Sequence, residues 1–169
     1  ANSGAWGTLL LDPADISVPG TIDEATLEAG LEAGNFTLDT FDEFGTDPGD
    51  ITIDVDVDWG ASTRLSLTAD RNVFLNGAIN GPNGELNIDV GNLIVAGNPD
   101  ADVNVDRFLL ESGTWSLITP VLPTFSANNF ELEFGTSFLR FSGGNGEPAN
   151  PFEIVDVFGL QGLEGAPSG

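Results

Sequence analysis

The sequence predicts an all-β fold, a parallel β-helix with one short helix near residues 21–33. Three observations predict it. Short apolar runs alternate with polar residues at period 2, as strands with one buried face do. Residue pairs typical of turns separate these runs. Apolar pairs also recur at a nearly fixed long spacing, as they do in a solenoid whose coils stack on one another.

The clearest strand covers residues 51–58, where Ile and Val alternate with Thr and Asp. One face of this strand is therefore apolar, and the other carries a row of carboxylates. Similar short runs follow at 65–67, 73–75, 86–90, 93–95, 103–109 and 154–158. The turn signals between the runs are Pro48-Gly49, Asn76-Gly77, Asn80-Gly81, Asn83-Gly84 and Asn145-Gly146.

The long spacing favours a solenoid over the alternative, a β-sandwich built of hairpins. The apolar pair at 51 and 53 recurs 22 residues later, the pair at 65 and 67 recurs 21 later, and the pair at 73 and 75 recurs 20 later. Such offsets suit coils that differ only in loop length. The residues expected to point inward are Ile53, Leu67, Leu75, Leu86, Ile88 and Val95.

The same spacing predicts contacts between polar side chains on the outer surface. At an offset of 22 residues, Asp54 lies one coil from Asn76 and Asp58 lies one coil from Asn80. An amide can donate a hydrogen bond to a carboxylate at the separation of parallel strands, about 4.8 Å. We therefore expect these pairs to be hydrogen-bonded.

One segment has the pattern of a helix. Thr21 can cap it and Glu24 completes a capping box, while Leu27 and Leu31 lie four residues apart on one face. Gly34 can end it. A lone short helix in a β chain is expected to serve as a loop or end cap of the solenoid.

The length of 169 residues suits one domain, which we expect over residues 1–162. The most regular coils are expected at 48–110. Residues 111–162 are richer in Phe and Pro and are expected to be less regular. Residues 163–169, with Gly, Pro and Ser, are typical of a linker.

The composition disfavours most enzyme chemistry. Four arginines face 27 acidic residues, the net charge is −23, and Cys, His, Met, Tyr and Lys are absent. Nucleophilic triads, imidazole or thiolate zinc sites and Schiff bases therefore cannot form. A charge of this sign repels nucleic acid and anionic lipid, and no apolar stretch is long enough to insert into a membrane.

Carboxylates and arginines remain as candidate functional groups. A glycosidase pair stays open, because 27 acids offer many pairs and distance in sequence does not report distance in space. We expect Arg64, Arg71, Arg107 and Arg140 to neutralise neighbouring acids such as Asp70 and Asp106.

Calcium is the expected metal, if any is bound, and its weak candidate ligands are Asp54, Asp56 and Asp58. The three acids resemble the start of an EF-hand loop. Trp59 stands where that loop needs Gly, however, and Leu65 where it needs a bidentate Glu. An EF-hand is therefore excluded, and an irregular acidic site stays open.

Several segments resemble one family. They are 7–13 (GTLLLDP), 27–40 (LEAGLEAGNFTLDT), 49–59 (GDITIDVDVDW), 65–79 (LSLTADRNVFLNGAI), 113–115 (GTW), 122–130 (LPTFSANNF), 138–146 (FLRFSGGNG) and 154–162 (IVDVFGLQG). They are similar to the passengers of filamentous-haemagglutinin-like large exoproteins, adhesins of the two-partner-secretion type in Gram-negative bacteria. The resemblance covers most of the chain and is one of phrasing, without a catalytic signature.

This resemblance implies a right-handed parallel β-helix that is secreted across the outer membrane. It implies a role in adhesion, aggregation or biofilm matrix. The N-terminal secretion domain of such proteins has no counterpart in this sequence, so the resemblance implies an excised or processed piece of passenger. The charge of −23 exceeds that of a typical host-cell adhesin and favours a structural role in the environment.

Together these observations predict a non-enzymatic, extracellular or cell-surface module of a filament or matrix. Its expected partners are copies of itself or neighbouring solenoid segments, joined end to end, and a cell surface or glycan. The alternative functions are a polysaccharide-active β-helix enzyme that uses carboxylates and a small ligand-binding β-sandwich.

Overall fold

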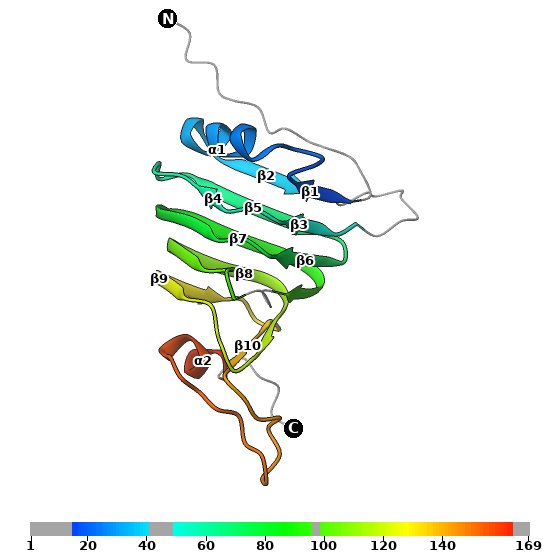
Figure 1. Ribbon diagram of the computed structural model, residues 1–169, viewed down its shortest axis with the longest axis vertical. Coiled ribbons are helices and arrows are strands. Elements are labelled where there is room, and N and C mark those ends of the chain that lie inside the picture. Colours follow the sequence, from blue (N-terminus) through cyan, green and yellow to red (C-terminus); the bar gives the residue numbers. More distant parts are fainter. Residues whose placement is uncertain (1–14, 41–48, 96–98, 164–169) are drawn as a thin grey trace, which may run out of the picture.

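The computed structural model describes residues 15–40, 49–95 and 99–163, which form a parallel β-solenoid as the sequence predicts (Figure 1). Every pairing between its named strands is parallel. A sandwich of hairpins would pair neighbouring strands antiparallel, so that alternative is excluded for these residues. The family-like segment 7–13 and the linker-like tail beyond residue 163 lie outside the described residues.

The strands wind around three faces, which we define by their ladders. The first face holds β1 (Ile16–Val18), β3 (Ile51–Ile53), β6 (Asn72–Leu75) and β10 (Ser137–Phe141). The second face begins with β4 (Val57–Asp58), and the third with β2 (Phe36–Asp39) and β5 (Arg64–Ala69). β7 (Ile79–Val95) and β8 (Val103–Ile118) bend through all three faces, and β9 (Phe125–Leu132) through the second and third.

The predicted register is confirmed between the second coil, which contains β3, β4 and β5, and the third coil, which contains β6 and the first part of β7. The strand pairings include Ile53 with Leu75, Leu65 with Leu86, and Leu67 with Ile88. All of these side chains are fully buried. The dipeptides Asn80-Gly81 and Asn83-Gly84, predicted as turns, lie within β7 at the corner between its second-face and third-face parts, where the register shifts.

The register prediction is wrong by one residue at the next coil. Val73 pairs with Ile94 instead of Leu93. Because side chains of a strand alternate between its two sides, a slip of one residue exchanges the buried and exposed sets. Ile94 is fully buried, Leu93 is 36% exposed, and Val95, which was predicted to point inward, is only partly buried on the outer side.

The inward side chains stack in columns along the solenoid axis. The first-face column is Ile16, Ile51, Val73, Ile94, Trp115 and Phe138. The second-face column is Val57, Ile79, Val103 and Phe125. Each column is aliphatic at its N-terminal end and aromatic at its C-terminal end, so the last coils contain a cluster of rings.

The predicted helix forms as α1 (Glu24–Ala33), with Leu27 and Leu31 buried as expected. Its N-cap is Asp23 instead of Thr21, because the Asp23 carboxylate accepts a hydrogen bond from the backbone N–H of Thr26 at 2.9 Å. Thr21 lies in the preceding turn, where its hydroxyl accepts a hydrogen bond from the backbone N–H of Ser17.

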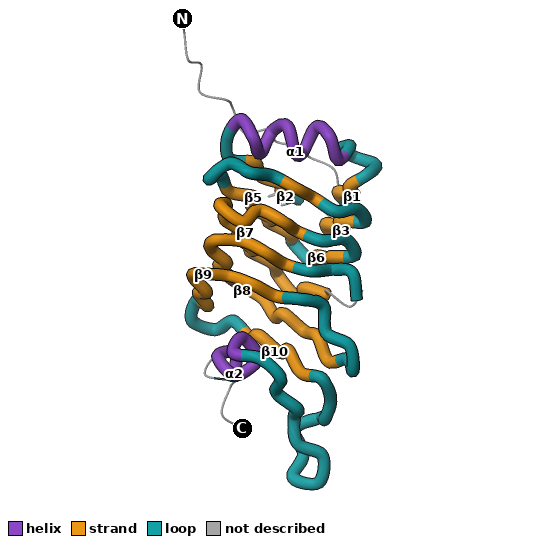
Figure 2. The backbone as a smooth tube through the Cα atoms, turned by 60° about the vertical axis from the view of Figure 1, so that its left-hand side comes forward, coloured by secondary structure: helices purple, strands orange, loops and turns teal. Residues whose placement is uncertain are grey.

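α1 lies across the N-terminal end of the solenoid, next to β4 (Figures 1 and 2). Its Glu28 and Glu32 side chains accept hydrogen bonds from the backbone N–H groups of Asp58 and Gly60, at 2.8 and 2.5 Å. These carboxylates replace the carbonyl groups of a missing strand. The helix therefore closes an edge that would otherwise be available for strand pairing.

The run at 154–158, predicted as a strand, is instead the approach to a second helix, α2 (Val157–Gly162). Asp156 caps this helix by accepting a hydrogen bond from the backbone N–H of Gly159. A Cβ atom at Gly159 or Gly162 would lie within 2.5 Å of a backbone carbonyl oxygen of β10. The two glycines therefore allow the helix to pack directly on that strand.

None of the described helices is long and apolar enough to cross a membrane.

Candidate functional site

The three predicted carboxylates lie on the outer surface of the second coil, and each accepts a hydrogen bond from the next coil. Asp54 accepts from the Asn76 amide at 2.7 Å, and Asp58 accepts from the Asn80 amide at 2.6 Å. Both contacts were predicted from the spacing and are confirmed. Asp56 accepts from a backbone N–H group, that of Ala78, at 2.8 Å.

The same carboxylates do not converge on one point. Among the residues that the structure describes, no group of three or more acidic side chains is arranged to hold a metal ion. Each of the three acids is directed along the solenoid axis toward its partner in the next coil. They form a row of separate contacts instead of a calcium loop.

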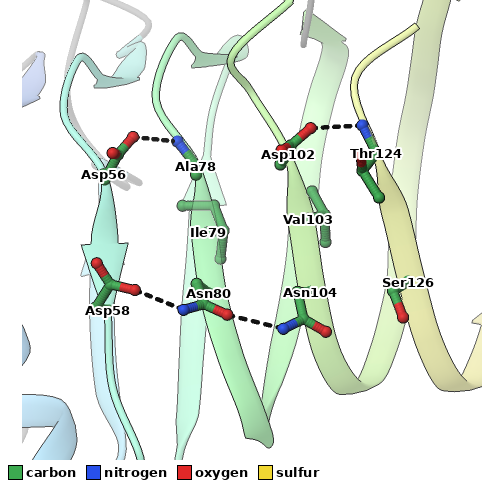
Figure 3. A pocket seen from close by; sticks show the side chains of 10 residues that line it. All are labelled: Asp56, Asp58, Ala78, Ile79, Asn80, Asp102, Val103, Asn104, Thr124 and Ser126. Atoms are coloured by element: carbon green, nitrogen blue, oxygen red, sulfur yellow. Dashed lines mark hydrogen bonds between the residues drawn. The ribbon is translucent and has the colours of Figure 1, made fainter.

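A polar groove runs over the second face, across β4, β7, β8 and β9 (Figure 3). It is lined by Asp56, Asp58, Ala78, Ile79, Asn80, Asp102, Val103, Asn104, Thr124 and Ser126. Two of the predicted calcium candidates, Asp56 and Asp58, are among them. Asn80 was predicted as the partner of Asp58. The remaining polar residues of the groove were not singled out from the sequence, although their spacing of 22 to 24 residues was a usable signal.

One row of the groove is a chain of side-chain hydrogen bonds. The Asn104 amide donates to the Asn80 carbonyl oxygen at 2.8 Å, and the Asn80 amide donates to Asp58 at 2.6 Å (Figure 3). Ser126 occupies the next position in register. The side-chain amides of Asn80 and Asn104 both donate in the direction of the Asp58 carboxylate. The negative charge of Asp58 therefore orients both amides.

A second row runs parallel to the first and holds the strands by side-chain to backbone contacts. Asp56 accepts from the N–H of Ala78, and Asp102 accepts from the N–H of Thr124 (Figure 3). The groove therefore presents carboxylates, amides and hydroxyls on strands whose register is fixed. Groups of these kinds bind ligands that are rich in hydroxyl groups.

We expect Asn80→Asp to lower the free energy of unfolding by about 1 kcal/mol, because it places two carboxylates opposite each other at the spacing of parallel strands. The substitution also removes the donor to Asp58. Urea denaturation measures the loss, which added salt should reduce. Asn150→Asp makes the same charge change at an exposed position and should have little effect. Equal losses in both variants would contradict the role of the amide row.

A ladder of alternating charge follows the outer side of the third face. Arg64 contacts Glu85 at 2.8 Å, and Arg107 lies between Glu85 and Glu131, at 3.7 and 2.7 Å. The hydrogen bond from Arg107 lowers the pKa of Glu131. This ladder joins four successive coils and was not predicted from the sequence.

The predicted arginine partners are wrong. Arg71 binds Asp50 instead of Asp70, and the hydrogen bond from Arg71 lowers the pKa of Asp50. Arg107 likewise does not pair with Asp106, which accepts a hydrogen bond from the Asn128 amide. Asp70 and Arg71 lie in the bend between β5 and β6, and Asp106 lies at the corner of β8 between its second-face and third-face parts. Arg71 therefore reaches an acid of the preceding coil, and Arg107 reaches acids of the coils on either side, instead of their sequence neighbours.

Arg140 differs from the other three arginines because it points inward. Its side chain is 4% exposed, and its Nε atom lies 2.8 Å from Asp156 Oδ2. One terminal nitrogen donates to the carbonyl oxygen of Pro123, and the guanidinium lies 5.7 Å from the centre of the Phe125 ring. These contacts join β10, α2 and the loop before β9.

Comparison of the chain with protein-family models, with curated proteins and with solved structures found no match.

Proposed function

We propose that the protein is a non-enzymatic, extracellular module of a fibre or matrix, and that its polar groove contacts a cell surface or glycan. The observation that carries this proposal is the row of amides over the second face, in which Asn80 and Asn104 are each oriented by a hydrogen bond to the side chain of the preceding coil. A rigid row of this kind suits repeated, weak contacts with a polymer.

The chemistry of the side chains supports binding over catalysis. The chain has no His, Cys or Lys, so carboxylates would have to supply both the acid and the base of any reaction. Asp56, Asp58 and Asp102 in the groove each accept a hydrogen bond from the neighbouring coil. They are therefore engaged in holding the strands together.

The charge narrows the class of polymer. At a net charge of −23 the protein repels uronate-rich and sulfated polysaccharides as well as nucleic acid. Neutral glycans carry hydroxyl groups that can both donate and accept hydrogen bonds, and they are not repelled. We propose neutral glycans as the ligand class. An extracellular location and end-to-end contacts with copies or neighbouring solenoid segments belong to the same proposal.

The test is binding of the immobilised chain to neutral polysaccharides such as cellulose, dextran and galactan. A double variant, Asn104→Ala with Ser126→Ala, removes two polar groups of the groove. We expect its binding to be about tenfold weaker, from the loss of one or two hydrogen bonds. Asn150→Ala, at an exposed position outside the groove, should bind like the natural chain. Equal binding by all three chains, or no binding at all, would overturn the proposal.

A second candidate function is cleavage of polysaccharides, because the groove brings three carboxylates to one surface. A polysaccharide-active enzyme would use two of them as acid and base or nucleophile. Release of reducing ends from the same polysaccharides, abolished by Asp58→Asn, would establish this activity in place of binding alone. We expect no release.

We expect sodium chloride to raise the thermal midpoint of unfolding, because 23 surplus negative charges repel one another more in the folded chain than in the expanded one. Three thermal melts test this: one in chelator at low salt, one in sodium chloride, and one in calcium at the same ionic strength as the sodium chloride. A larger rise in calcium, lost in Asp54→Asn, would place calcium among Asp54, Asp56 and Asp58. Identical melts in chelator and sodium chloride would show that the acidic surface does not affect stability.

A further inference from the structure

The C-terminal end of the solenoid carries a cluster of exposed apolar side chains. We call it the C-terminal patch, and it consists of Ile154, Val155, Val157, Leu160 and Leu163. These side chains are between 38% and 62% exposed, and they lie within ten successive residues. Large apolar side chains gathered in this way on a water-soluble surface mark an interaction site.

The patch lies on a rigid element. On the inner side of α2, Gly159 and Gly162 pack on the backbone of β10, and Phe158 packs against Phe125 and Phe130 at 4.8 and 5.3 Å between ring centres. The helix therefore cannot turn its apolar residues inward, because that side is already filled. The exposure of the patch is a fixed feature of the fold.

The helix at the other end of the molecule provides the comparison. α1 also covers an end of the solenoid, but its exposed residues are acidic or small, including Glu24, Thr26, Ala29 and Glu32. End caps of solenoids need a polar outer side when they face water. α1 meets this requirement and α2 does not, so the outer side of α2 is suited to an apolar partner.

Charge identifies the partner. Within 154–163 the sole acid is Asp156, and it is neutralised by its ion pair with Arg140. Two copies that each carry −23 repel one another over most of their surfaces. The C-terminal patch itself adds no unpaired acid to this repulsion. Its apolar surface is complementary to itself, as a twofold-symmetric contact requires.

We propose that two copies of the chain associate tail to tail through the C-terminal patch. This deepens the proposed structural role by naming a partner, and it does not depend on glycan binding. Five half-exposed side chains provide less area than the roughly 800 Å² per partner of a typical stable complex. The dimer is therefore weak, with a dissociation constant of about 10 μM. It strengthens as salt screens the charges of the two copies.

Sedimentation equilibrium of the full chain tests the proposal, with expected dimer formation at concentrations of about 10 to 100 μM. Raising the salt from about 0.1 M to 1 M shortens the screening length from about 10 to 3 Å and should favour the dimer. We expect Leu160→Gln and Leu163→Gln to weaken dimerisation at least tenfold. Leu93→Gln is the matched control, because Leu93 is 36% exposed on β7 and Leu163 is 38% exposed.

A second test uses the absence of cysteine from the chain. Leu160→Cys places one thiol in the patch, and a twofold contact brings the two copies of this thiol together. Mild oxidation should then give a disulfide-linked dimer, whereas Leu93→Cys should stay monomeric. A natural chain that is monomeric at all concentrations, or variants that dimerise like it, would overturn the proposal. The patch would then serve another apolar partner, and the glycan-binding test would stand unaffected.

Discussion

Replacing Phe108 by Ala is expected to lower the free energy of unfolding by about 3 to 5 kcal/mol, a range typical of a large cavity in a rigid core. Phe108 is fully buried on the third face. Its ring lies 5.1 to 5.9 Å from those of Trp115, Phe125, Phe130 and Phe138. Four rings would lose a partner at once, and each edge-on or stacked pair adds to the area term.

Urea denaturation followed by tryptophan fluorescence measures this loss, since Trp115 lies in the same cluster. Phe134→Ala is the control, because the Phe134 side chain is fully exposed. We expect its effect to stay within about 0.5 kcal/mol. A Phe108→Ala variant with nearly natural stability would show that the aromatic end of the solenoid collapses around the cavity, contrary to the rigid packing described above.

The repeat of apolar pairs was enough to predict most of the fold. Parallel strands one coil apart share a column of inward side chains, so an offset of 21 or 22 residues fixes which residues stack. The prediction failed at Leu93, where three large aliphatic residues occur in a row, 93 to 95. Alternation cannot decide which of the three points inward. The actual offset of 21 residues between Val73 and Ile94 settles it.

The second helix shows a different limit. Residues 154–158 alternate like a strand, and the features that produce a helix there are the Asp156 cap and two glycines three residues apart. Those glycines have a meaning only once β10 is known to lie against them. Helix packing on a strand that is 16 or more residues away in sequence leaves no local pattern to detect.

The offset between coils also explains why the candidate site was predicted only in part. The hydrogen bonds from Asn76 and Asn80 follow from one offset that the apolar residues already define. Asp102, Asn104 and Ser126 belong to coils with offsets of 22 to 24, which vary with the corner between faces. The inward position of Arg140 was not predictable, because the prediction assigns apolar side chains to the inside of the solenoid and charged side chains to the outside.

Asp156→Asn is expected to lower the free energy of unfolding by about 3 kcal/mol, because it leaves the buried charge of Arg140 without a counter-charge. The Arg140 side chain is 4% exposed, whereas Asp156 is 28% exposed. The expected loss therefore lies at the lower end of the range for a broken buried pair. Asn keeps an oxygen that can accept the hydrogen bond from the Gly159 N–H, so the helix cap is preserved.

Glu85→Gln is the matched control, since it removes one carboxylate that contacts Arg64 and Arg107 at the surface. Surface pairs contribute about 1 kcal/mol or less, so its effect should be small. A third variant combines Asp156→Asn with Arg140→Met and removes both charges. We expect it to recover much of the loss, because an apolar side chain in this buried position carries no desolvation cost.

Urea denaturation gives the three free energies, and amide hydrogen exchange at residues 157–162 reports whether the loss is local. In Asp156→Asn the amides of α2 should exchange faster than those of β5 and β7, because Arg140 and Asp156 join this helix to the last coil. A loss no larger than that of Glu85→Gln would mean that the Arg140 charge is solvated. The close packing of α2 on β10 would then depend on Gly159, Gly162 and Phe158, without a contribution from the ion pair.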